Sequence, residues 1–361
     1  MDAPSESQGK ESRELTDTKG DRPMQIVRIG LDIAKNVLQV HGVNEQGKVV
    51  VQKQLSRGKG LVSFAQLPVC RIGIEACGSA HDWGRELQKL GHDVRLMAGH
   101  LSNPYRPKQK NDRNEAEAIG EAVARPQRRF VPSKTVEQQA VVTVPRAREL
   151  LVSERTAVAH QIRGLLMEYG KGIPAGIQRL RRELPAVLSA DDEGLPILAR
   201  PVVSELQARL SELEERMAGH DRQSAQLARQ NAAAKRLRQV EGVGPITATA
   251  IVATVGEATA FSHGRQFAAW LGLGPKQGST GGKPRLGPIT TRGNVDLRTL
   301  LIHGARSVLQ YTAKRTDAKS VGVEGVRQRR GDNIAAVALA AKHARILWAL
   351  LAGGQEYRIA A

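Results

Sequence analysis

Two strand-like segments near the start of the chain each carry one acidic residue among apolar neighbours. They are IGLDIA, with Asp32, and IGIEA, with Glu75. An unpaired carboxylate in an apolar strand is costly, so each acid needs a partner, commonly a metal ion or a base. Two apolar segments span Ile26 to Val43, a third strand follows the Asn44–Gly47 turn, and strands and helices then alternate as far as Ala98. This order predicts a mixed α/β sheet.

The remainder of the chain is mainly helical in pattern. Helices are expected over residues 111–124, 136–169 and 202–238. The last of these has leucines at heptad-like spacing, namely Leu206, Leu210 and Leu213. This spacing predicts either a coiled-coil arm or one helix of a bundle, and the pattern alone does not decide between them.

A second domain is expected from about residue 239, where the sequence becomes glycine-rich and basic. The apolar segment from Asp332 to Ala352 is expected to close its core as one or two helices. Lys342, His343 and Arg345 interrupt that segment, and a membrane span would not carry them at its centre. We therefore expect no membrane insertion.

Charge and composition limit the classes of partner. The chain has 54 Lys and Arg against 36 Asp and Glu, a net charge of +18. Residues 1–25 hold six acids and four bases with few apolar residues, which predicts a disordered tail and leaves +20 on the rest. Only 3% of residues are aromatic, which excludes base stacking as the main binding mode. These features predict a partner with a phosphate backbone.

Cysteine usage and the N-terminus indicate a reducing compartment. Cys70 and Cys77 stand seven apart with no second pair, which fits neither a disulfide framework nor a zinc site. No apolar signal sequence follows Met1. We expect a cytoplasmic protein.

A second pair of acids completes a candidate metal site. Asp112 and Glu115 are three residues apart at the start of a predicted helix, so they share one face. With the two strand acids, they form the set of hard oxygen ligands that a site for two Mg²⁺ ions requires. The alternative leaves each acid a structural role: Asp32 caps a turn, Glu75 pairs with an arginine, and Asp112 is only an N-cap. Glu117 and Glu121, further along, are expected on a solvated face.

A glycine-rich basic loop, PKQGSTGGKPRLG from Pro275 to Gly287, is the second candidate site. Between Ser262 and Arg315 there are nine bases and one acid, Asp296. Backbone amides of such a loop can approach a phosphate, and a hydroxyl within it can act on that phosphate. The available hydroxyls are Ser279 and Thr280. The loop lacks the spacing of a nucleotide-binding P-loop or a dinucleotide fingerprint. A mobile loop with solvated charges is the alternative.

A third signal is the segment VEGVGPITATA, a helix, a Gly-Val-Gly turn and a second helix. In helix-hairpin-helix modules such a turn, here Gly242 and Gly244, presents backbone N–H groups to a DNA phosphate. An ordinary helix connection is the alternative. The nine histidines form no metal-binding spacing, so zinc chemistry has little support.

Seven segments, in order, resemble the DEDD transposases, the insertion-sequence recombinases related to the Piv DNA invertase and guided by a bridge RNA. They are IGLDIAKN, IGIEACGSAHDWGRELQKLGHDVRLM, KNDRNEAEAI, RRFVPSKTVEQQA, VEGVGPITATAIVATVG, FAAWLGLGPKQGSTGGKPRLGPITTRGN and LRTLLIHGAR. The resemblance begins at about Ile26 and continues to the C-terminus.

The resemblance implies a domain organisation. It comprises a tail over 1–25, a RuvC-like (ribonuclease H-like) catalytic domain over 26–135, a helical linker and coiled coil over 136–238, and a mainly helical serine transposase domain over 239–361. Family members act as dimers and tetramers in which the RuvC-like domain of one subunit meets the serine domain of another. Residues from Val202 to about Arg238 would then be the oligomerisation element.

The same resemblance implies the site residues. Asp32, Glu75 and Asp112 match three metal-binding acids, and Glu115 stands where the family usually has Asp, an oxygen donor one methylene longer. Ser279 matches the nucleophile that attacks a DNA phosphodiester, with Mg²⁺ stabilising the leaving oxygen. The implied partners are donor DNA, target DNA and a structured guide RNA. Candidate nucleic-acid contacts are Gly242, Gly244, Lys276, Lys283, Arg285, Arg292 and Arg298.

Two other functions remain open on the sequence. One is a structure-specific nuclease that uses only the acidic site and forms no covalent intermediate. The other is a non-catalytic nucleic-acid-binding relative, in which Glu115 marks loss of activity.

Overall fold

The computed structural model describes residues 25–107, 109–125, 130–189, 195–354 and 356–357. The chain divides into two compact units, Met1–Thr135 and Val136–Ala361. Apart from Gln25, the tail predicted to be disordered lies outside the described residues.

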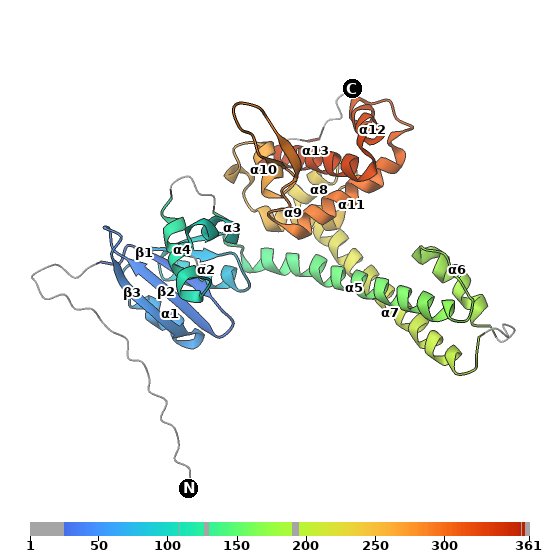
Figure 1. The fold of residues 1–361 in the computed structure, drawn as a ribbon, viewed down its shortest axis with the longest axis horizontal. Helices are drawn as coiled ribbons and strands as arrows, with labels where there is room; N and C mark the ends of the chain where they lie inside the picture. The colour runs from blue at the N-terminus through green and yellow to red at the C-terminus, as the bar shows by residue number, and fades with distance from the viewer. Residues whose placement is uncertain (1–24, 108, 126–129, 190–194, 355, 358–361) are drawn as a thin grey trace, which may run out of the picture. The chain divides into compact units, whose positions relative to one another are not determined.

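The first unit is built on a five-stranded mixed sheet (Figure 1). Its strands are β1 (Arg28–Ile33), β2 (Val37–Val43), β3 (Val49–Ser56), β4 (Arg71–Glu75) and β5 (Asp93–Met97). They lie in the order β3-β2-β1-β4-β5. Strand β2 is antiparallel to both of its neighbours, β1 and β3, whereas β1, β4 and β5 are parallel to one another. The predicted mixed α/β sheet is confirmed, and the arrangement is compatible with a ribonuclease H-like domain.

Helices cover both faces of this sheet. Ile29, Leu31 and Ile33 point to one face, where they pack in a core with Phe64 of α1 (Arg57–Ala65) and Trp83 of α2 (Ala80–Lys89). The opposite face is covered by α4 (Asp112–Val123), whose buried residues include Ile119 and Val123. The short helix α3 (Gly99–Ser102) and the 3₁₀ turn η1 (Asn103–Tyr105) precede α4. Because side chains alternate along a strand, β1 and β4 present Gly30, Asp32, Gly73 and Glu75 to the face of α4.

Two glycines allow α4 to approach the sheet closely. A Cβ atom on Gly30 would lie 1.9 Å from the Ala116 carbonyl oxygen and 2.4 Å from the Gly120 nitrogen. A Cβ atom on Gly73 would lie 2.8 Å from the Cβ of Val123. The contact at Gly30 is between backbones, so no larger residue fits there without moving the helix.

The second unit begins with two long helices that lie side by side (Figure 1), α5 (Val136–Met167) and α7 (Ala199–Gln230). The shorter α6 (Ile177–Val187) adds Leu180 and Leu184 to their shared core. Of the heptad-like leucines, Leu210 and Leu213 are buried within the chain and Leu206 is partly buried. The alternative of a bundle helix therefore accounts for this stripe. The helix ends at Gln230, and Asn231 caps a separate helix, α8 (Ala232–Leu237).

The C-terminal part of this unit is a helical core with one short hairpin. The elements after α8 are α9 (Pro245–Val255), η2 (Ala258–Ala260), α10 (Gly264–Trp270), β6 (Pro275–Gln277), β7 (Leu286–Ile289), α11 (Val295–Thr312), α12 (Ala318–Arg330) and α13 (Asp332–Gly353). The predicted apolar segment is one helix, α13. It is long and apolar enough to cross a membrane by length and composition. In the structure its residues Leu339, Ala340 and Leu347 lie in the same core as α9, α10 and α11.

The close packing at Gly30 gives a stability prediction. Gly30→Ala should lower the free energy of unfolding of the first unit by about 3 kcal/mol, because the new methyl group overlaps backbone atoms of α4. Thermal unfolding of the full chain, followed by circular dichroism, measures the change.

Gly58 provides the matched control. It lies in α1, and a Cβ atom there would meet no other atom within 4 Å. Gly58→Ala should leave stability unchanged or raise it by up to about 1 kcal/mol, since alanine favours helix more than glycine. Equal melting temperatures for the two variants would show that α4 does not pack on β1 as described.

Candidate metal centre and serine loop

Adjacent parallel strands place the first two acids. Leu31 of β1 pairs with Ile74 of β4, and Asp32 and Glu75 each follow directly. Each acid is the second residue after a glycine that faces α4, in the repeated pattern Ile-Gly-x-acid. Alternation along the strands therefore places both carboxylates on the face of the sheet that α4 covers.

The start of α4 places the second pair of acids. Asn111 is the N-cap, and its side chain accepts a hydrogen bond of 2.8 Å from the backbone N–H of Asn114. Asp112 and Glu115 therefore lie within the first turn, where negative charge is favoured by the helix dipole. The alternative that Asp112 serves as the N-cap is wrong, because Asn111 takes that role.

Three of the four predicted acids converge. One oxygen each from Asp32, Asp112 and Glu115 can be chosen so that all lie within 4.8 Å of one another. Burial, which has the largest effect, and then the negative charges of Glu115, Asp112 and Glu75 together raise the pKa of Asp32 to about 6. The backbone N–H of Ile33 opposes the shift by its hydrogen bond.

Glu75 lies outside this group of three. Its recorded polar contact is with the Ser102 hydroxyl, which donates to Oε2 at 3.4 Å. A Cβ atom on Gly99 would lie 2.4 Å from Glu75 Oε1, so the backbone of α3 is close to the carboxylate. Within the described part of the chain no ion pair with an arginine is recorded for Glu75, so that alternative has no support. Its charge still acts on Asp32.

The donor set suits a hard divalent cation. All three converging groups are carboxylates, and a cation between them would relieve the repulsion that raises the pKa of Asp32. Glu115 also contacts two cationic side chains: Arg106 Nη1 at 3.2 Å and Lys110 Nζ at 3.7 Å from its Oε1. The predicted solvated acid Glu121 pairs instead with Arg28 and Arg125.

Ser279 lies in the exposed connection between β6 and β7, which form a two-stranded antiparallel hairpin. The sequence predicts a loop for this segment, whereas the structure pairs its two ends as short strands. Ser279 Oγ accepts two hydrogen bonds of 3.0 Å, from the backbone N–H of Arg285 and from Nε2 of Gln277. Thr280 instead begins the tight turn, where its carbonyl accepts from the Lys283 N–H at 3.1 Å. Of the two candidate hydroxyls, that of Ser279 is therefore the one recorded with hydrogen bonds across the hairpin.

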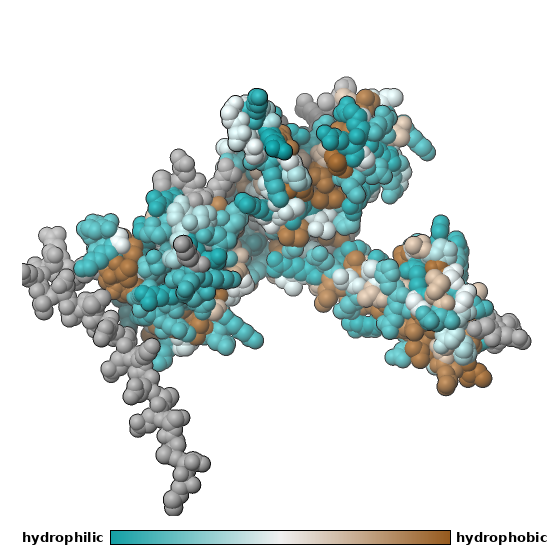
Figure 2. Space-filling view, viewed as in Figure 1, coloured by the Kyte–Doolittle hydropathy of each residue, from teal (hydrophilic) through white to brown (hydrophobic). Residues whose placement is uncertain are grey.

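The hairpin carries unpaired positive charge. Lys276, Lys283, Arg285 and Arg292 are exposed, and none has an ion pair within the described residues. The segment's one acid, Asp296, pairs with Arg146 of α5 at 3.3 Å. The surface of this hairpin, the orange strand pair of Figure 1, is mostly white to teal in the space-filling view, with a small brown area (Figure 2).

Arg298 differs from the other predicted contacts. It is 8% exposed, and its Nη1 donates to the Leu271 carbonyl at 3.0 Å. A Cβ atom on Gly272 would lie 2.7 Å from the same Nη1. The guanidinium therefore holds the segment that leads into β6 and is not available at the surface.

The predicted Gly-Val-Gly turn connects α8 to α9 as expected. Gly242 has a φ of +77°, and a Cβ atom on it would lie 2.5 Å from the Gly304 carbonyl oxygen of α11. Gly242 therefore serves close packing. Gly244 is the N-cap of α9 and has open space around it, with Pro245 in the first turn.

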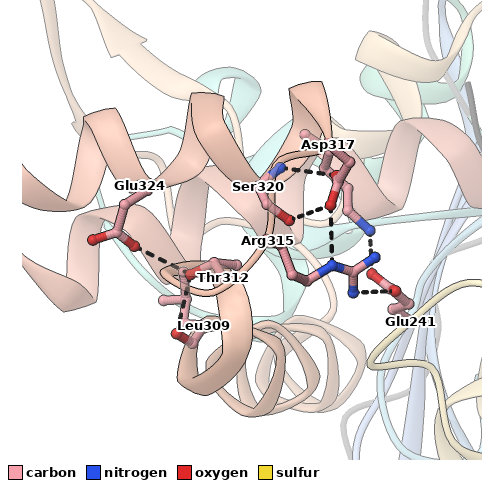
Figure 3. A network of polar contacts seen from close by, with 8 residues as sticks. Glu241, Leu309, Thr312, Arg315, Asp317, Ser320 and Glu324 are labelled. Atoms are coloured by element: carbon pink, nitrogen blue, oxygen red, sulfur yellow. Dashed lines mark hydrogen bonds and ion pairs between the residues drawn. The ribbon is translucent and has the colours of Figure 1, made fainter. Parts of the chain in front are cut away.

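A polar network anchors this turn (Figure 3). Glu241 accepts from Arg315, and Arg315 Nε also donates to Asp317 at 3.0 Å. Asp317 accepts from the Ser320 hydroxyl at 2.7 Å and caps α12. Lys319 also pairs with Glu241. Of the nine bases between Ser262 and Arg315, Arg315 is therefore occupied by structural ion pairs.

Sequence reasoning missed several neighbours of the sites. Gly30 and Gly73 were signalled by the repeated Ile-Gly-x-acid pattern, which marks a helix lying on both strands. Arg106 and Gln277 carry no comparable signal, because their contacts depend on how a loop and a hairpin close.

The raised pKa of Asp32 predicts a pH effect. A carboxyl group with a higher pKa in the folded chain than in the unfolded chain binds protons more tightly when folded. In a chelating buffer, stability of the first unit should therefore fall as pH rises from about 4 to about 6. Asp32→Asn should remove this fall and melt at a higher temperature than the parent chain at pH 7.

Adding Mg²⁺ at pH 7 should raise the melting temperature of the parent chain and not that of Asp32→Asn. The control is Glu117→Gln, which lies on α4 outside the acidic cluster. This variant should keep both the pH profile and the Mg²⁺ response of the parent chain. An Asp32→Asn chain that responds to Mg²⁺ as the parent does would contradict the metal centre.

Both candidate sites lie within matched family models. The model DEDD_Tnp_IS110, described as "Transposase", matches residues 29–171, which include the four acids. A second model, described as "Transposase IS116/IS110/IS902 family", matches residues 234–320, which include Ser279 and the turn at Gly242. Together they reach into both units.

Curated relatives match over nearly the whole chain. A probable family 20 transposase of Pseudomonas aeruginosa is 49% identical, over 93% of this chain and 99% of its own length. The transposase for insertion sequence element IS1111A of Coxiella burnetii is 41% identical, over 95% and 94%. The transposase for IS1328 of Yersinia enterocolitica is 33% identical, over 92% and 98%. Transposases catalyse DNA cleavage and rejoining, and this chain belongs to the IS110/IS116/IS902 family of transposases.

Proposed function

We propose that this transposase excises and inserts its element with Ser279 as the nucleophile and with Mg²⁺ held by Asp32, Glu75, Asp112 and Glu115, at sites selected by a guide RNA. The observation that carries the proposal is the convergence of three carboxylates from β1 and α4 within 4.8 Å. Such a cluster is costly without a cation, and all its donors are oxygens.

The bound Mg²⁺ would stabilise charge on the phosphate and on the leaving oxygen. The chain's own residues hold the reacting groups. Oγ of Ser279 attacks phosphorus, its proton passes to solvent, and the bond to the leaving deoxyribose oxygen breaks, with that oxygen gaining a proton. Rejoining is the reverse step with the hydroxyl of another strand, which releases the serine.

The hairpin geometry supports this role for Ser279. Its Oγ already accepts hydrogen bonds from the Arg285 N–H and from Gln277. Both donors would stabilise negative charge on the oxygen as its proton leaves, without reorganisation. The exposed cations of the hairpin, Lys276, Lys283, Arg285 and Arg292, would bind the surrounding phosphates.

The composition supports recognition by an RNA. With 3% aromatic residues and a net charge of +18, the chain has many groups that contact backbones and few that stack on bases. If base pairing with an RNA selects the DNA sequence, the protein needs mainly backbone contacts and few contacts to bases. The Gly244 end of the turn before α9 offers backbone N–H groups to the same duplexes.

The active form would be a homodimer or homotetramer. The stripe on α7 is used within the chain, so the contact must employ another surface. Apolar side chains are exposed at the ends of α5 and α7, at Met167, Ile197 and Leu198. The end of this helical pair shows hydrophobic patches in Figure 2.

The nucleophile is tested by Ser279→Ala. On a plasmid with donor and target sites, strand exchange should fall below detection, and the protein–DNA adduct seen on a denaturing gel for the parent chain should disappear. Thr280→Ala is the matched control and should keep both. Cleavage by Ser279→Ala at the parent rate would instead favour a metal-dependent nuclease without a covalent intermediate.

Guidance is tested by reconstitution with transcripts of the element's non-coding ends. Recombination should require such a transcript, and changing its target-complementary loop should redirect insertion to the matching new site. Sequencing of the products measures this. Insertion at the original site without any RNA would contradict guidance while leaving the serine chemistry intact.

A further inference from the structure

A cavity of about 320 Å³ lies beside the β6–β7 hairpin that carries Ser279, here called the serine hairpin. It is lined by Pro275, Lys276, Gln277, Thr290 and Arg292. Two of these residues are cations, and no acid is among them. Neither Lys276 nor Arg292 has an ion pair in the part of the chain that the structure describes. Uncompensated cations around a cavity are suited to an anion with several oxygens.

Thr290 contributes an unsatisfied hydroxyl. Its backbone is fully engaged: its N–H donates to the Gly274 carbonyl at 2.8 Å, and its carbonyl accepts from the Thr291 hydroxyl at 2.6 Å. Its Oγ1, by contrast, is buried without a hydrogen-bond partner. Buried hydroxyls are nearly always paired, so this one is free to donate to a water molecule or to a ligand that enters the cavity.

The backbone next to Thr290 is strained. Thr291 has a φ of +56°, a conformation that β-branched residues rarely adopt. The turn is fixed against the preceding segment, since a Cβ atom on Gly272 would lie 2.1 Å from the Arg292 carbonyl oxygen. A Cβ atom on Gly293 would lie 1.9 Å from the Trp270 carbonyl oxygen. Strain held by such close packing is typical of positions that orient a binding side chain, here Arg292.

Gln277 connects the cavity to the nucleophile. It lines the cavity, and its Nε2 donates to Ser279 Oγ at 3.0 Å. A ligand in the cavity would therefore lie beside the same residue that orients the serine hydroxyl.

We propose that this cavity binds a backbone phosphate of the DNA strand, the neighbour of the phosphodiester that Ser279 attacks. Lys276 and Arg292 supply the positive charge, and Thr290 Oγ1 donates a hydrogen bond. Gln277 acts as a positioning residue that fixes Ser279 relative to the anchored strand. The assignment of the neighbouring phosphate rests on the proposed role of Ser279, whereas phosphate binding in the cavity does not.

The first test measures affinity of the full chain for fluorescein-labelled random-sequence duplex DNA by fluorescence anisotropy. Thr290→Val removes only the hydroxyl, and it should weaken binding about tenfold with no loss of melting temperature, since that hydroxyl has no partner in the fold. Arg292→Gln and Lys276→Gln should each weaken binding about tenfold. Arg292→Gln should also lower the slope of log affinity against log salt by about one.

Arg329→Gln is the matched control. Arg329 is an exposed arginine of α12 in the same unit, outside the cavity. It should change affinity by less than about threefold, as expected of one solvated charge. The cavity assignment is overturned if Thr290→Val and Arg292→Gln bind DNA as Arg329→Gln does. It is also overturned if their losses appear only with an RNA duplex as the probe.

The second test places a neutral methylphosphonate beside the cleaved bond. The parent chain should form the serine–DNA link about tenfold more slowly on this substrate than on ordinary DNA. Arg292→Gln should form the link at the same rate on both substrates, because the contact to that phosphate is already lost. Additive losses would contradict the neighbouring position. If the protein–DNA link still formed in Ser279→Ala, the proposed function would be wrong. The affinity measurements would still decide whether the cavity binds phosphate.

Discussion

Helix α4 lies so close to strand β1 that their backbones touch, and the first unit depends on this contact. Gly30 leaves room for the carbonyl of Ala116, which sets the height of the helix above the sheet. The N-cap at Asn111 then fixes where the helix starts. As a result, the first-turn acids Asp112 and Glu115 meet Asp32, and their repulsion contributes to the raised pKa of that carboxyl. Close packing thus holds like charges together, an arrangement that protonation of Asp32 or a bound cation would relieve.

The two units differ in the charged groups that they leave for function. The first unit gathers carboxylates at the ends of β1 and β4, whereas the hairpin of the second unit leaves Lys276, Lys283, Arg285 and Arg292 without acidic partners. Other charges in the second unit are used structurally, as in the pairs that Arg315 and Lys319 make with Glu241 (Figure 3). The count of 54 Lys and Arg residues therefore overstates the number of cations available to nucleic acid, because some of them are paired with acids within the fold.

The serine hairpin combines a small scaffold with strong local constraint. Ser279 is oriented by one backbone N–H and one side-chain amide, and the strained turn at Thr291 is locked by glycine contacts at Gly272 and Gly293. Buried Arg298 supports the same segment from beneath through the Leu271 carbonyl. An exposed loop with such support can present a hydroxyl and several cations in a fixed geometry, which a phosphate ligand requires.

The sequence by itself determined the strands, their acids and the order of elements in the first unit, because strand alternation and helix caps are local signals. Its motifs also sufficed to indicate the transposase family. Tertiary structure decided what depends on distant contacts. It placed Glu75 apart from the other three acids, turned Arg298 into the core, and used the leucine stripe of α7 within the chain. The spacing of residues predicts which side chains share a face of a helix or strand, but the neighbours of that face are decided by tertiary packing.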